Sequence, residues 1–423
     1  MAPEKKPNII YIFLSMVFVV SASQLNQALA SPVQDYEVYF EDLYLVRGQI
    51  DEKIVYRSEK ADEAIQFAID KLAGQGGEVL LHRGTFLLEH PVQLKNNLIL
   101  KGKSRGTQLL VSSENESGIG ILCKDLKGSQ VMDLSVRPVE DGAGMAGIVI
   151  DNSGDCRIRD VHCQAFGSYG IMLINNSFLC EVTGCQLLDN RQSNLFLENL
   201  REKGRGGDFL PNMVTNLTIY GGGNGIECIY AIVVNINNCQ IFQTKGYGLY
   251  IHSTSNSVLI TGCRTFQIET DAIVVRDSHE INISSNIFCW HRGNGIVLDN
   301  VTWGTISANN IIDSGVRAAD GEYRNGIVLS NVTRSIQVSG NAIFNWGDQV
   351  PMKYGIFEKD RCRMNSITNN TINYYDGEAV LSKGKGTLVN NNQGKGPDAW
   401  IGMDREPWPD FSRTPIEAFI DSN

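Results

Sequence analysis

The sequence has 423 residues, 42% of them hydrophobic, which is a globular composition and enough chain for one long repeat domain or two ordinary domains. A formal net charge of −10 argues against an extended nucleic-acid-binding surface. Glycine is frequent, with 42 residues and no collagen-like period, as in a chain with many turns.

Residues 1–30 have the pattern of a secretory signal peptide. Lys5 and Lys6 precede an apolar run at residues 9–22, and an Ala-Leu-Ala tripeptide ends at residue 30. The apolar run is short for a membrane span. We therefore expect secretion, to the extracellular space or the periplasm, with no stable membrane insertion after cleavage. An uncleaved membrane anchor is the alternative.

Residues 31–60 have mixed composition and are expected to form an irregular lead-in segment. The next stretch, residues 61–73, carries apolar side chains at helical spacing on one face, at Ala64, Ile65, Ala68, Ile69 and Leu72. Gly74 follows as a stop signal. A Gly-Gly turn and strand-like runs come next and lead to Gly102.

The rest of the chain repeats at intervals of roughly 20–35 residues, which indicates a solenoid. Each repeat has a short alternating run, a Cys or Asn, two apolar residues, a loop and a Gly-hydrophobic start to a new run. The Cys/Asn column falls at Cys163, Cys185, Tyr220, Cys239, Cys263, Asn286, Asn310, Asn341, Asn370 and Asn392. Because the runs alternate over only four to six residues, each repeat reads as three short strands, one coil of a parallel β-helix.

Two kinds of buried column follow from this register. One is an interior stack of Ile171, Leu195, Ile226, Leu249, Ile273, Ile296, Ile327 and Ile356. The other is a ladder of side-chain amides at a turn, for which we expect Asn286, Asn310, Asn341 and Asn370 to stack on one edge. Asparagine tolerates the left-handed backbone conformation that such a turn needs. Cysteine fills the same slot in earlier coils, where we favour free thiols over disulfides.

The helix at 61–73, the Gly-Gly turn, the Arg-Gly-Thr-Phe run at 83–86 and the coils together resemble the pectate lyase superfamily, the pectin lyase-like right-handed β-helix proteins. The resemblance covers roughly residues 60–395. It implies an all-β fold, a right-handed parallel β-helix solenoid of roughly ten or more coils with an N-terminal capping helix.

The expected organisation is therefore a signal peptide at 1–30, a lead-in at 31–60, a β-helix domain with its cap at 61–395 and a C-terminal tail at 396–423. The tail contains Trp400, Trp408 and Phe411 and no longer repeats. We expect it to run back along the solenoid or to cover its open end, since an exposed last coil would be a free sheet edge.

The resemblance implies that substrates lie on the sheet after the long loop, which here contains the Gly-hydrophobic strands. Long insertions next to these strands support this choice, at residues 137–146, 199–212, 313–325 and 346–354. Strand alternation gives a first outward column of Val149, Met172, Phe196, Glu227, Tyr250, Val274, Val297, Val328 and Phe357. The second outward column is Asp151, Ile174, Glu198, Ile229, His252, Arg276, Asp299 and Ser330.

Ionisable groups, aromatic side chains and long loops thus converge on one face. The candidate catalytic residues are Tyr250, His252, Arg276, Glu227 and Asp271. The candidate substrate-binding residues are Phe196, His291, Arg292, Asp299, Arg324 and Phe357. The structural alternative is a surface ion-pair ladder at His252, Arg276 and Asp299, with the apolar members of the column forming a subunit contact.

Two reactions fit these side chains. β-Elimination on a uronic acid needs a cation against the carboxylate (Arg276 or Arg292), a base for the C5 proton (His252) and an acid for the leaving oxygen (Tyr250). Hydrolysis needs two carboxylates, for which Glu227 and Asp271 stand roughly two coils apart. The leading hypothesis is a secreted enzyme that cleaves a uronic-acid-containing polysaccharide as a lyase, with a polygalacturonase-like glycoside hydrolase as the alternative.

The coil around Asp271 is partly similar to the polygalacturonase pattern, but Thr270 replaces the first Asp of its Asp pair and Asn294 replaces the His of Gly-His-Gly. That family's other motifs are missing. No Cys/His spacing marks a zinc site, and we identify no cofactor, leaving calcium open. A non-catalytic glycan-binding or structural surface protein is the rival hypothesis, and a homo-oligomer is compatible with either.

Overall fold

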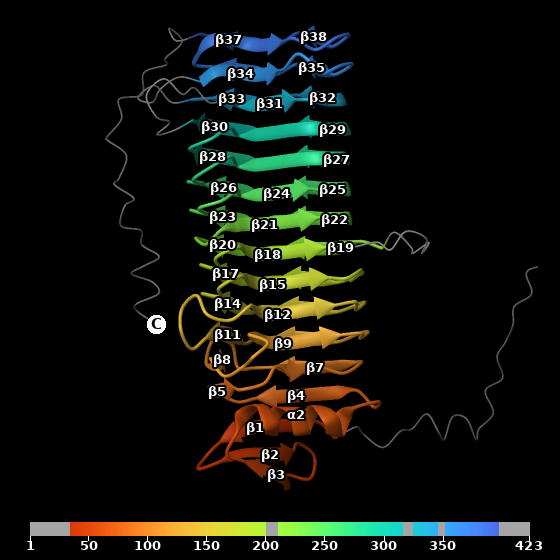
Figure 1. Ribbon diagram of the computed structural model, residues 1–423, viewed down its shortest axis with the longest axis vertical. Coiled ribbons are helices and arrows are strands. Elements are labelled where there is room, and N and C mark those ends of the chain that lie inside the picture. Colours follow the sequence, from red (N-terminus) through yellow and green to blue (C-terminus); the bar gives the residue numbers. More distant parts are fainter. Residues whose placement is uncertain (1–33, 200–209, 316–324, 346–351, 397–423) are drawn as a thin grey trace, which may run out of the picture.

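A computed structural model describes residues 34–199, 210–315, 325–345 and 352–396. The proposed signal peptide and all but the first residue of the tail lie outside this part of the chain. The described residues form a tall stack of coils, each built from three short strands that pair in parallel with their equivalents in the coils before and after (Figure 1).

The three strands of a coil belong to three faces of the stack, which we name sheets 1, 2 and 3. The strands of sheet 1 are β6 (Val92–Gln93), β9 (Ile119–Lys124), β12 (Ala146–Asp151), β15 (Tyr169–Ile174), β18 (Ser193–Glu198), β21 (Asn224–Ile229), β24 (Leu249–His252), the first parts of β27 (Ile273–Ser284) and β29 (Ile296–Ser307), β31 (Ile327–Ser330), β34 (Met352–Glu358) and β37 (Tyr375–Ser382). The strands of sheet 2 are β4 (Gly77–Leu81), β7 (Leu98–Lys101), β10 (Gln130–Met132), β13 (Arg157–Arg159), β16 (Glu181–Thr183), β19 (Asn212–Thr215), β22 (Ile232–Asn237), β25 (Asn256–Thr261), the second parts of β27 and β29, β32 (Arg334–Ser339), β35 (Ser366–Thr368) and β38 (Leu388–Asn390).

Sheet 3 contains thirteen strands, one for each coil of the described stack. They are β5 (Gly84–Leu88), β8 (Thr107–Val111), β11 (Ser135–Pro138), β14 (His162–Gln164), β17 (Gln186–Leu188), β20 (Thr218–Tyr220), β23 (Gln240–Phe242), β26 (Arg264–Phe266), β28 (Ile287–His291), β30 (Asn310–Ser314), β33 (Ala342–Phe344), β36 (Thr371–Asn373) and β39 (Gln393–Lys395). Sheets 1 and 2 are joined because β27 and β29 each continue through the corner between them.

The N-terminal end of the stack is built differently. Helix α2 (Ala61–Leu72) lies beneath β4 and buries its apolar face against the first strands (Figure 1). Beyond it lie β1 (Tyr36–Phe40), β2 (Tyr44–Gly48) and β3 (Ile54–Ser58), which pair antiparallel. The expectation of an irregular lead-in at 31–60 was wrong, because these short alternating runs pair with one another and β1 also pairs with β4. Within the described residues, no helix is long and apolar enough to cross a membrane.

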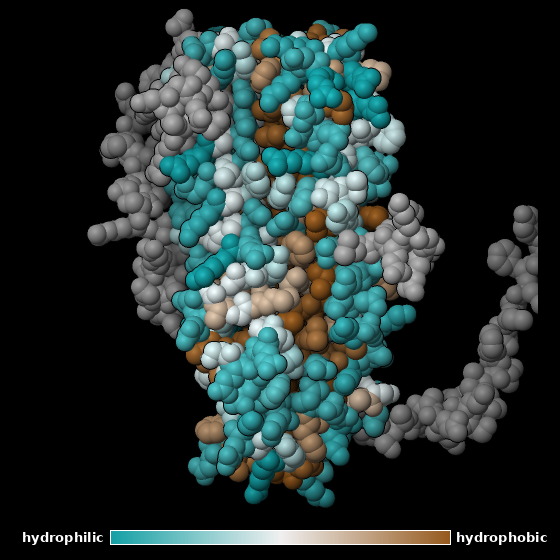
Figure 2. All heavy atoms as spheres, in the orientation of Figure 1, coloured by the Kyte–Doolittle hydropathy of each residue, from teal (hydrophilic) through white to brown (hydrophobic). Residues whose placement is uncertain are grey.

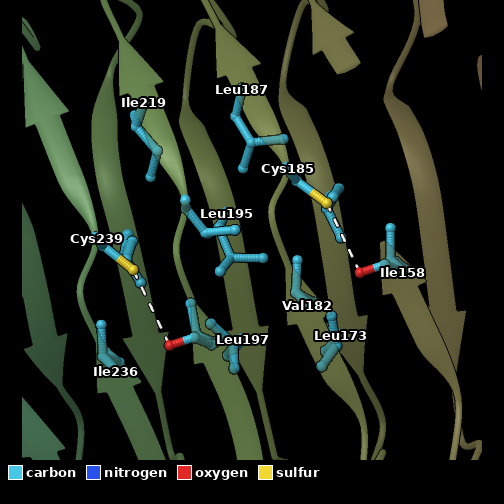
Figure 3. Close-up of a cluster of buried hydrophobic side chains, with 14 of the residues drawn as sticks. Ile158, Leu173, Val182, Cys185, Leu187, Leu195, Leu197, Ile219, Ile236 and Cys239 are labelled. Carbon is cyan, nitrogen blue, oxygen red and sulfur yellow. Dashed lines mark hydrogen bonds between the residues drawn. The ribbon is translucent and has the colours of Figure 1, made fainter. Parts of the chain in front are cut away.

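The interior is a set of aliphatic stacks that run along the axis (Figure 3). The stack predicted from Ile171 to Ile356 is confirmed, since its eight members are fully buried and pair in register from coil to coil. Burying such a side chain stabilises a fold by about 1.5–3 kcal/mol. Most of the stability of the solenoid therefore comes from contacts between neighbouring coils.

Glycine precedes most of these interior residues because adjacent coils approach closely there. A Cβ on Gly225 would lie 2.4 Å from the carbonyl oxygen of Gly248, and one on Gly248 would lie 2.6 Å from that of Ala272. The repeated Gly-hydrophobic pair is thus a packing requirement of sheet 1, which explains why it recurs in step with the coils.

An amide ladder does run along the corner between sheets 2 and 3, but one predicted member was wrong. Asn309, not Asn310, continues the ladder from Asn286 to Asn341. Asn309 is fully buried, and its amide nitrogen donates to the carbonyl of Ile283 at 3.0 Å and to Asn341 Oδ1 at 2.9 Å. Asn310 begins β30 and is exposed. The repeat pattern alone could not separate these adjacent asparagines.

The left-handed turn residue of this coil lies two positions before Asn310, where we expected it. Ala308, with φ of 54°, turns the chain, and Asn309 then points inward. Cys163 and Tyr220 were also wrongly placed in the corner column. Asp160 and Asn216 have positive φ there, and the residues that follow them, Val161 and Leu217, fill the buried corner.

Cysteines occupy the corner position in earlier coils. Cys185, Cys239 and Cys263 are buried free thiols, and each Sγ donates to a carbonyl of the preceding coil, Cys185 to Ile158 at 3.7 Å (Figure 3). Burial raises the pKa of Cys185 to about 12, so this thiol stays protonated at neutral pH. Cysteine therefore acts here as a small, weakly donating substitute for the ladder asparagine.

Replacing the true ladder residue should destabilise the fold. We expect Asn309→Leu to lower the free energy of unfolding by about 2–4 kcal/mol, because Ile283 and Asn286 would lose buried hydrogen-bond partners. The matched variant Asn310→Leu should change it by less than about 0.5 kcal/mol. Denaturant titration of the two variants measures this, and equal losses would contradict the assignment of the ladder.

Candidate functional site

The outward face of sheet 1 has the register that the sequence predicted. Met172 pairs with Phe196, Phe196 with Glu227, Glu227 with Tyr250 and Tyr250 with Val274. In the second column, Ile229 pairs with His252 and Arg276 with Asp299. The side chains chosen from the sequence therefore lie on neighbouring coils, and the rest of the site can be built from this placement.

The Glu227 side chain contacts three polar side chains on this face. Its Oε2 accepts hydrogen bonds from the Ser193 hydroxyl and from the Asn224 side-chain amide at 3.1 Å. Its Oε1 lies 3.2 Å from His252 Nε2. The carboxylate thus connects three coils, and only 17% of its side chain is exposed.

His252 and Tyr250 form a stack on the next strand. Their rings are 4.1 Å apart between centroids and nearly parallel, at 16°. The second imidazole nitrogen, Nδ1, lies 2.9 Å from the hydroxyl of Ser253. Tyr247, at the start of the same coil, packs against Tyr250 at 4.9 Å. The imidazole is therefore fixed in orientation by Glu227 at one nitrogen and by Tyr250 across its face.

Arg276 supplies the positive charge of the cluster. Its guanidinium carbon lies 5.8 Å from the centre of the Tyr250 ring, and its Nε lies 3.9 Å from Asp299 Oδ2. Within the described part of the chain, the buried Nε has no hydrogen-bond partner. The Arg276 side chain is 44% exposed. A guanidinium that is partly exposed to solvent is suited to an incoming carboxylate.

The surroundings set the charges of these two groups. Burial raises the pKa of Glu227, but the hydrogen bonds from His252, Ser193 and Asn224 outweigh it and hold that pKa below the ordinary glutamate value. Burial lowers the pKa of Arg276, but Tyr247, Tyr250 and Asp299 raise it by more. The pKa of Arg276 is therefore above the ordinary arginine value. At neutral pH the site therefore contains a carboxylate and a guanidinium that are both charged.

Asp271 and Arg292 lie apart from this cluster and have partners of their own. Asp271 Oδ1 accepts hydrogen bonds from the backbone N–H and, at 2.8 Å, the side-chain amide of Asn294, so the carboxylate holds a turn of the next coil. Arg292 is exposed and forms an ion pair with Glu269 at 2.7 Å. No contact joins Asp271 to Glu227 among the described residues, and their use as a hydrolytic pair stays a prediction.

The expectation that His291 binds substrate was wrong. It is the last residue of β28, its side chain points into the solenoid, and it is fully buried. Its Nε2 lies 3.1 Å from the hydroxyl of Thr265, and burial lowers its pKa to about 3. Its position before a loop suggested exposure, but Trp290 has a positive φ of 60°, which interrupts the alternation of β28 and turns His291 inward. Arg324 lies outside the described residues.

Aromatic side chains stand on this face at both sides of the charged cluster. Phe196 packs against Tyr169 at 4.8 Å, and Phe357 packs against Tyr354 at 5.0 Å. Around Phe196 a second hydrophobic cluster lies outside the solenoid core, with Ala146, Val149 and Met172 at its centre and Ile119, Leu122, Met145, Tyr169, Ile174 and Phe196 around them. Figure 2 looks onto this face and shows hydrophobic surface gathered over the strands around β12, β15 and β18.

Several residues of the site were missed from the sequence. Tyr247, Ser193 and Asn224 support the cluster, but polar residues at the start of a strand gave no signal of their own. Glu198 was placed in the second outward column without a role, although it follows Phe196 on β18. Among the described residues, no three His, Cys, Asp or Glu side chains gather closely enough to hold a metal ion.

Comparisons with known proteins agree with this architecture. The family model described as "Right handed beta helix region" matches residues 146–300. The chain is a right-handed parallel β-helix protein, as the resemblance to the pectate lyase superfamily implies. No curated protein matches it significantly in sequence.

Solved structures give the same fold at low sequence identity. The A-module of the mannuronan C-5 epimerase AlgE6 from Azotobacter vinelandii is 15% identical, with a TM-score of 0.66, over 79% of this chain and 95% of that one. The AlgE4 A-module from the same organism gives 14% and 0.63 over the same shares. The catalytic unit of a GH87 α-1,3-glucanase from Streptomyces thermodiastaticus gives 14% and 0.55, over 82% of this chain and 68% of that one.

The hydrogen bonds around Glu227 predict a pH-dependent contribution to stability. Because its pKa is lower in the folded protein than in the unfolded chain, Glu227 stabilises the fold above the unfolded pKa, and this contribution is lost as pH falls through the folded value. The difference in unfolding free energy between the wild type and Glu227→Gln should therefore be largest near neutral pH and shrink in acid.

Denaturant titrations between pH 3 and pH 7 give this difference directly. The matched variant Glu269→Gln removes a carboxylate from the exposed pair with Arg292 and should change stability little at any pH. A Glu227→Gln difference that stays constant with pH would show that the folded protein does not favour the ionised carboxylate.

Proposed function

We propose that the protein is a carbohydrate-active enzyme that cleaves a uronic-acid-containing polysaccharide by β-elimination on the outer face of sheet 1. The observation that carries this proposal is the partly exposed Arg276 guanidinium beside the Glu227-His252-Tyr250 cluster. A cation, an oriented imidazole and a phenol on adjacent coils are the three groups that this reaction needs.

The structural neighbours support a carbohydrate substrate. Their names describe a mannuronan C-5 epimerase, an α-1,3-glucanase and, with a TM-score of 0.51, a bacteriophage tailspike in complex with a pentasaccharide. These proteins share the fold at 12–15% identity, so the reaction itself has to be argued from the side chains of this chain.

In the proposed reaction, Arg276 binds the carboxylate of the uronate and stabilises the negative charge that develops when the C5 proton is removed. Glu227 is ionised and accepts a hydrogen bond from His252 Nε2–H, which leaves Nδ1 as the basic nitrogen. The proposed reaction requires the Ser253 hydroxyl, 2.9 Å from Nδ1, to give way to the substrate.

The bonding changes then balance within one sugar unit. His252 Nδ1 takes the C5 proton, and the electrons of the C5–H bond form a double bond between C4 and C5. The C4–O bond breaks, and Tyr250 donates its hydroxyl proton to the leaving oxygen. The products are an unsaturated uronate end and, on the neighbouring sugar, a new reducing end, and proton exchange with water returns His252 and Tyr250 to their starting forms.

A glycoside hydrolase is the second candidate function. One observation favours it, with Glu198 and Glu227 as the two carboxyl groups in place of Glu227 and Asp271. Burial raises the pKa of Glu198, whereas the pKa of Glu227 is lowered. The two carboxyl groups are diagonal neighbours, since Glu227 pairs with Phe196, two residues before Glu198. A carboxyl group with a raised pKa and an ionised carboxylate near it are the groups that glycoside hydrolysis uses.

We propose that the enzyme is exported through the segment at residues 1–30, because a polysaccharide substrate is too large to enter a cell.

We also propose that α2 closes the N-terminal end of the stack as a cap, since its apolar face packs against the first strands and would shield their edge.

The proposal is tested by incubating the purified protein with a panel of uronate-containing polysaccharides. Ultraviolet absorbance of the unsaturated product should rise together with reducing ends. His252→Ala should lower kcat/KM by about 10²–10⁴-fold, and Arg276→Ala by about 10²-fold or more. Arg264→Ala, an exposed arginine on sheet 3, is the matched control and should retain the wild-type rate.

Other outcomes point to the alternatives. Reducing ends without absorbance mean hydrolysis, and the assignment then moves to Glu198 and Glu227. Inversion at C5, seen by proton NMR with neither signal, means that the proton is removed and returned without cleavage. Binding with no reaction on any polymer favours a glycan-binding protein, and activity that survives both substitutions places the site elsewhere.

A further inference from the structure

The outward face of sheet 1 is charged on one side of Glu227 and hydrophobic on the other. Towards the C-terminal end, the second column carries His252, Arg276 and Asp299, and Arg276 is a cation whose side chain is 44% exposed. Towards the N-terminal end, the first column carries Phe196, Met172 and Val149, packed as a hydrophobic cluster outside the core. A polymer lying along this face would therefore meet two chemically different surfaces within a few coils.

The N-terminal surface combines an aromatic pair with carboxyl groups. Tyr169 and Phe196 are tilted at 40° with their ring centroids 4.8 Å apart, and both are half-buried. Burial raises the pKa of Tyr169, and so do the nearby charges of Glu227 and Glu198, so the phenol stands close to both carboxyl groups. We name Tyr169, Phe196 and Glu198 the aromatic subsite.

Within the described part of the chain, cations are scarce around the aromatic subsite. Within the residues that the structure describes, Glu198 forms no ion pair, and the ion-pair partner of Glu227 is His252. Further along the second column, Lys124 is engaged with Asp151 at 3.7 Å. Burial already disfavours the ionised form of Glu198 here. The same surroundings disfavour the carboxylate of a bound sugar.

We propose that the aromatic subsite binds an uncharged sugar unit, so that the substrate is a heteropolysaccharide in which a neutral sugar neighbours the uronate held by Arg276. This inference rests on the function proposed above. The apolar face of a neutral sugar packs against the Phe196 and Tyr169 rings. The hydroxyl groups of this sugar donate hydrogen bonds to the Glu198 carboxyl group. The carboxylate of a uronate in the same place would be repelled by Glu198.

The experiment measures equilibrium binding to the full-length His252→Ala variant, in which turnover is suppressed. The probes are oligosaccharides of equal length, one set of pure uronate (oligogalacturonate and oligomannuronate) and one set that alternates uronate with a neutral sugar (galacturonate-rhamnose and glucuronate-glucose). We expect the best alternating probe to bind about tenfold more tightly than either pure uronate.

Variants added to this background locate the effect. Phe196→Ala should weaken binding of the alternating probe about tenfold, and Phe196→Leu, which keeps apolar volume without a ring, should weaken it nearly as much. Glu198→Gln should improve binding of pure uronate about fivefold, and so reduce the preference for the alternating probe over pure uronate. Phe242→Ala on sheet 3 and Glu181→Gln on sheet 2 are the matched controls, and thermal unfolding checks that each variant is folded.

Each outcome decides the inference. Equal or tighter binding of pure uronate, no binding of any alternating probe, or a preference unchanged by Glu198→Gln would overturn it. If the wild type cleaves none of these sugars, the proposed reaction fails, yet a preference for the alternating probe that depends on Phe196 still supports the subsite. Cleavage of pure uronate alone would uphold the reaction and refute the subsite.

Discussion

Hydrogen bonding from each coil to the next fixes the register of the whole solenoid, and the functional face depends on that register. Parallel strand pairing supplies most of these bonds, and buried corner side chains reinforce them. Asn309 binds Asn286 on one side and Asn341 on the other, so one side chain ties three coils together. A slip of one residue would turn an interior isoleucine outward and a charged residue inward, which the buried stacks do not permit.

This constraint explains how much could be predicted from the sequence. The interior stack and the register of the two other columns were predicted correctly, because they follow from strand alternation and the close approach at the glycine column. The corner ladder was misplaced by one residue where two asparagines are adjacent, since phase alone does not say which one follows the left-handed turn at Ala308. The strands at residues 36–58 were missed because they do not share the repeat.

The candidate site was predictable in position but not in detail. Alternation placed Glu227, Tyr250 and His252 together, but it could not show that Ser193 and Asn224 hold the Glu227 carboxylate in its ionised form. Side-chain depth was the main source of error. His291 looked like a loop residue and is a buried, neutral histidine inside the solenoid. Nor could alternation show that one oxygen of Asp271 accepts hydrogen bonds from Asn294.

The same constraint separates the chemistry of this face from the loops around it. Phe196 and Glu227 are direct neighbours although the insertion at residues 199–212 lies between them in the sequence, because the strands pair regardless of loop length. Arg276, Asp299 and Ser330 likewise remain in one column across the insertion at 313–325. Loops can therefore change length without moving the outward columns. In such a fold, reactive groups are best carried by the columns, where the spacing is set by strand pairing, and adaptation to different polymers is best carried by the loops.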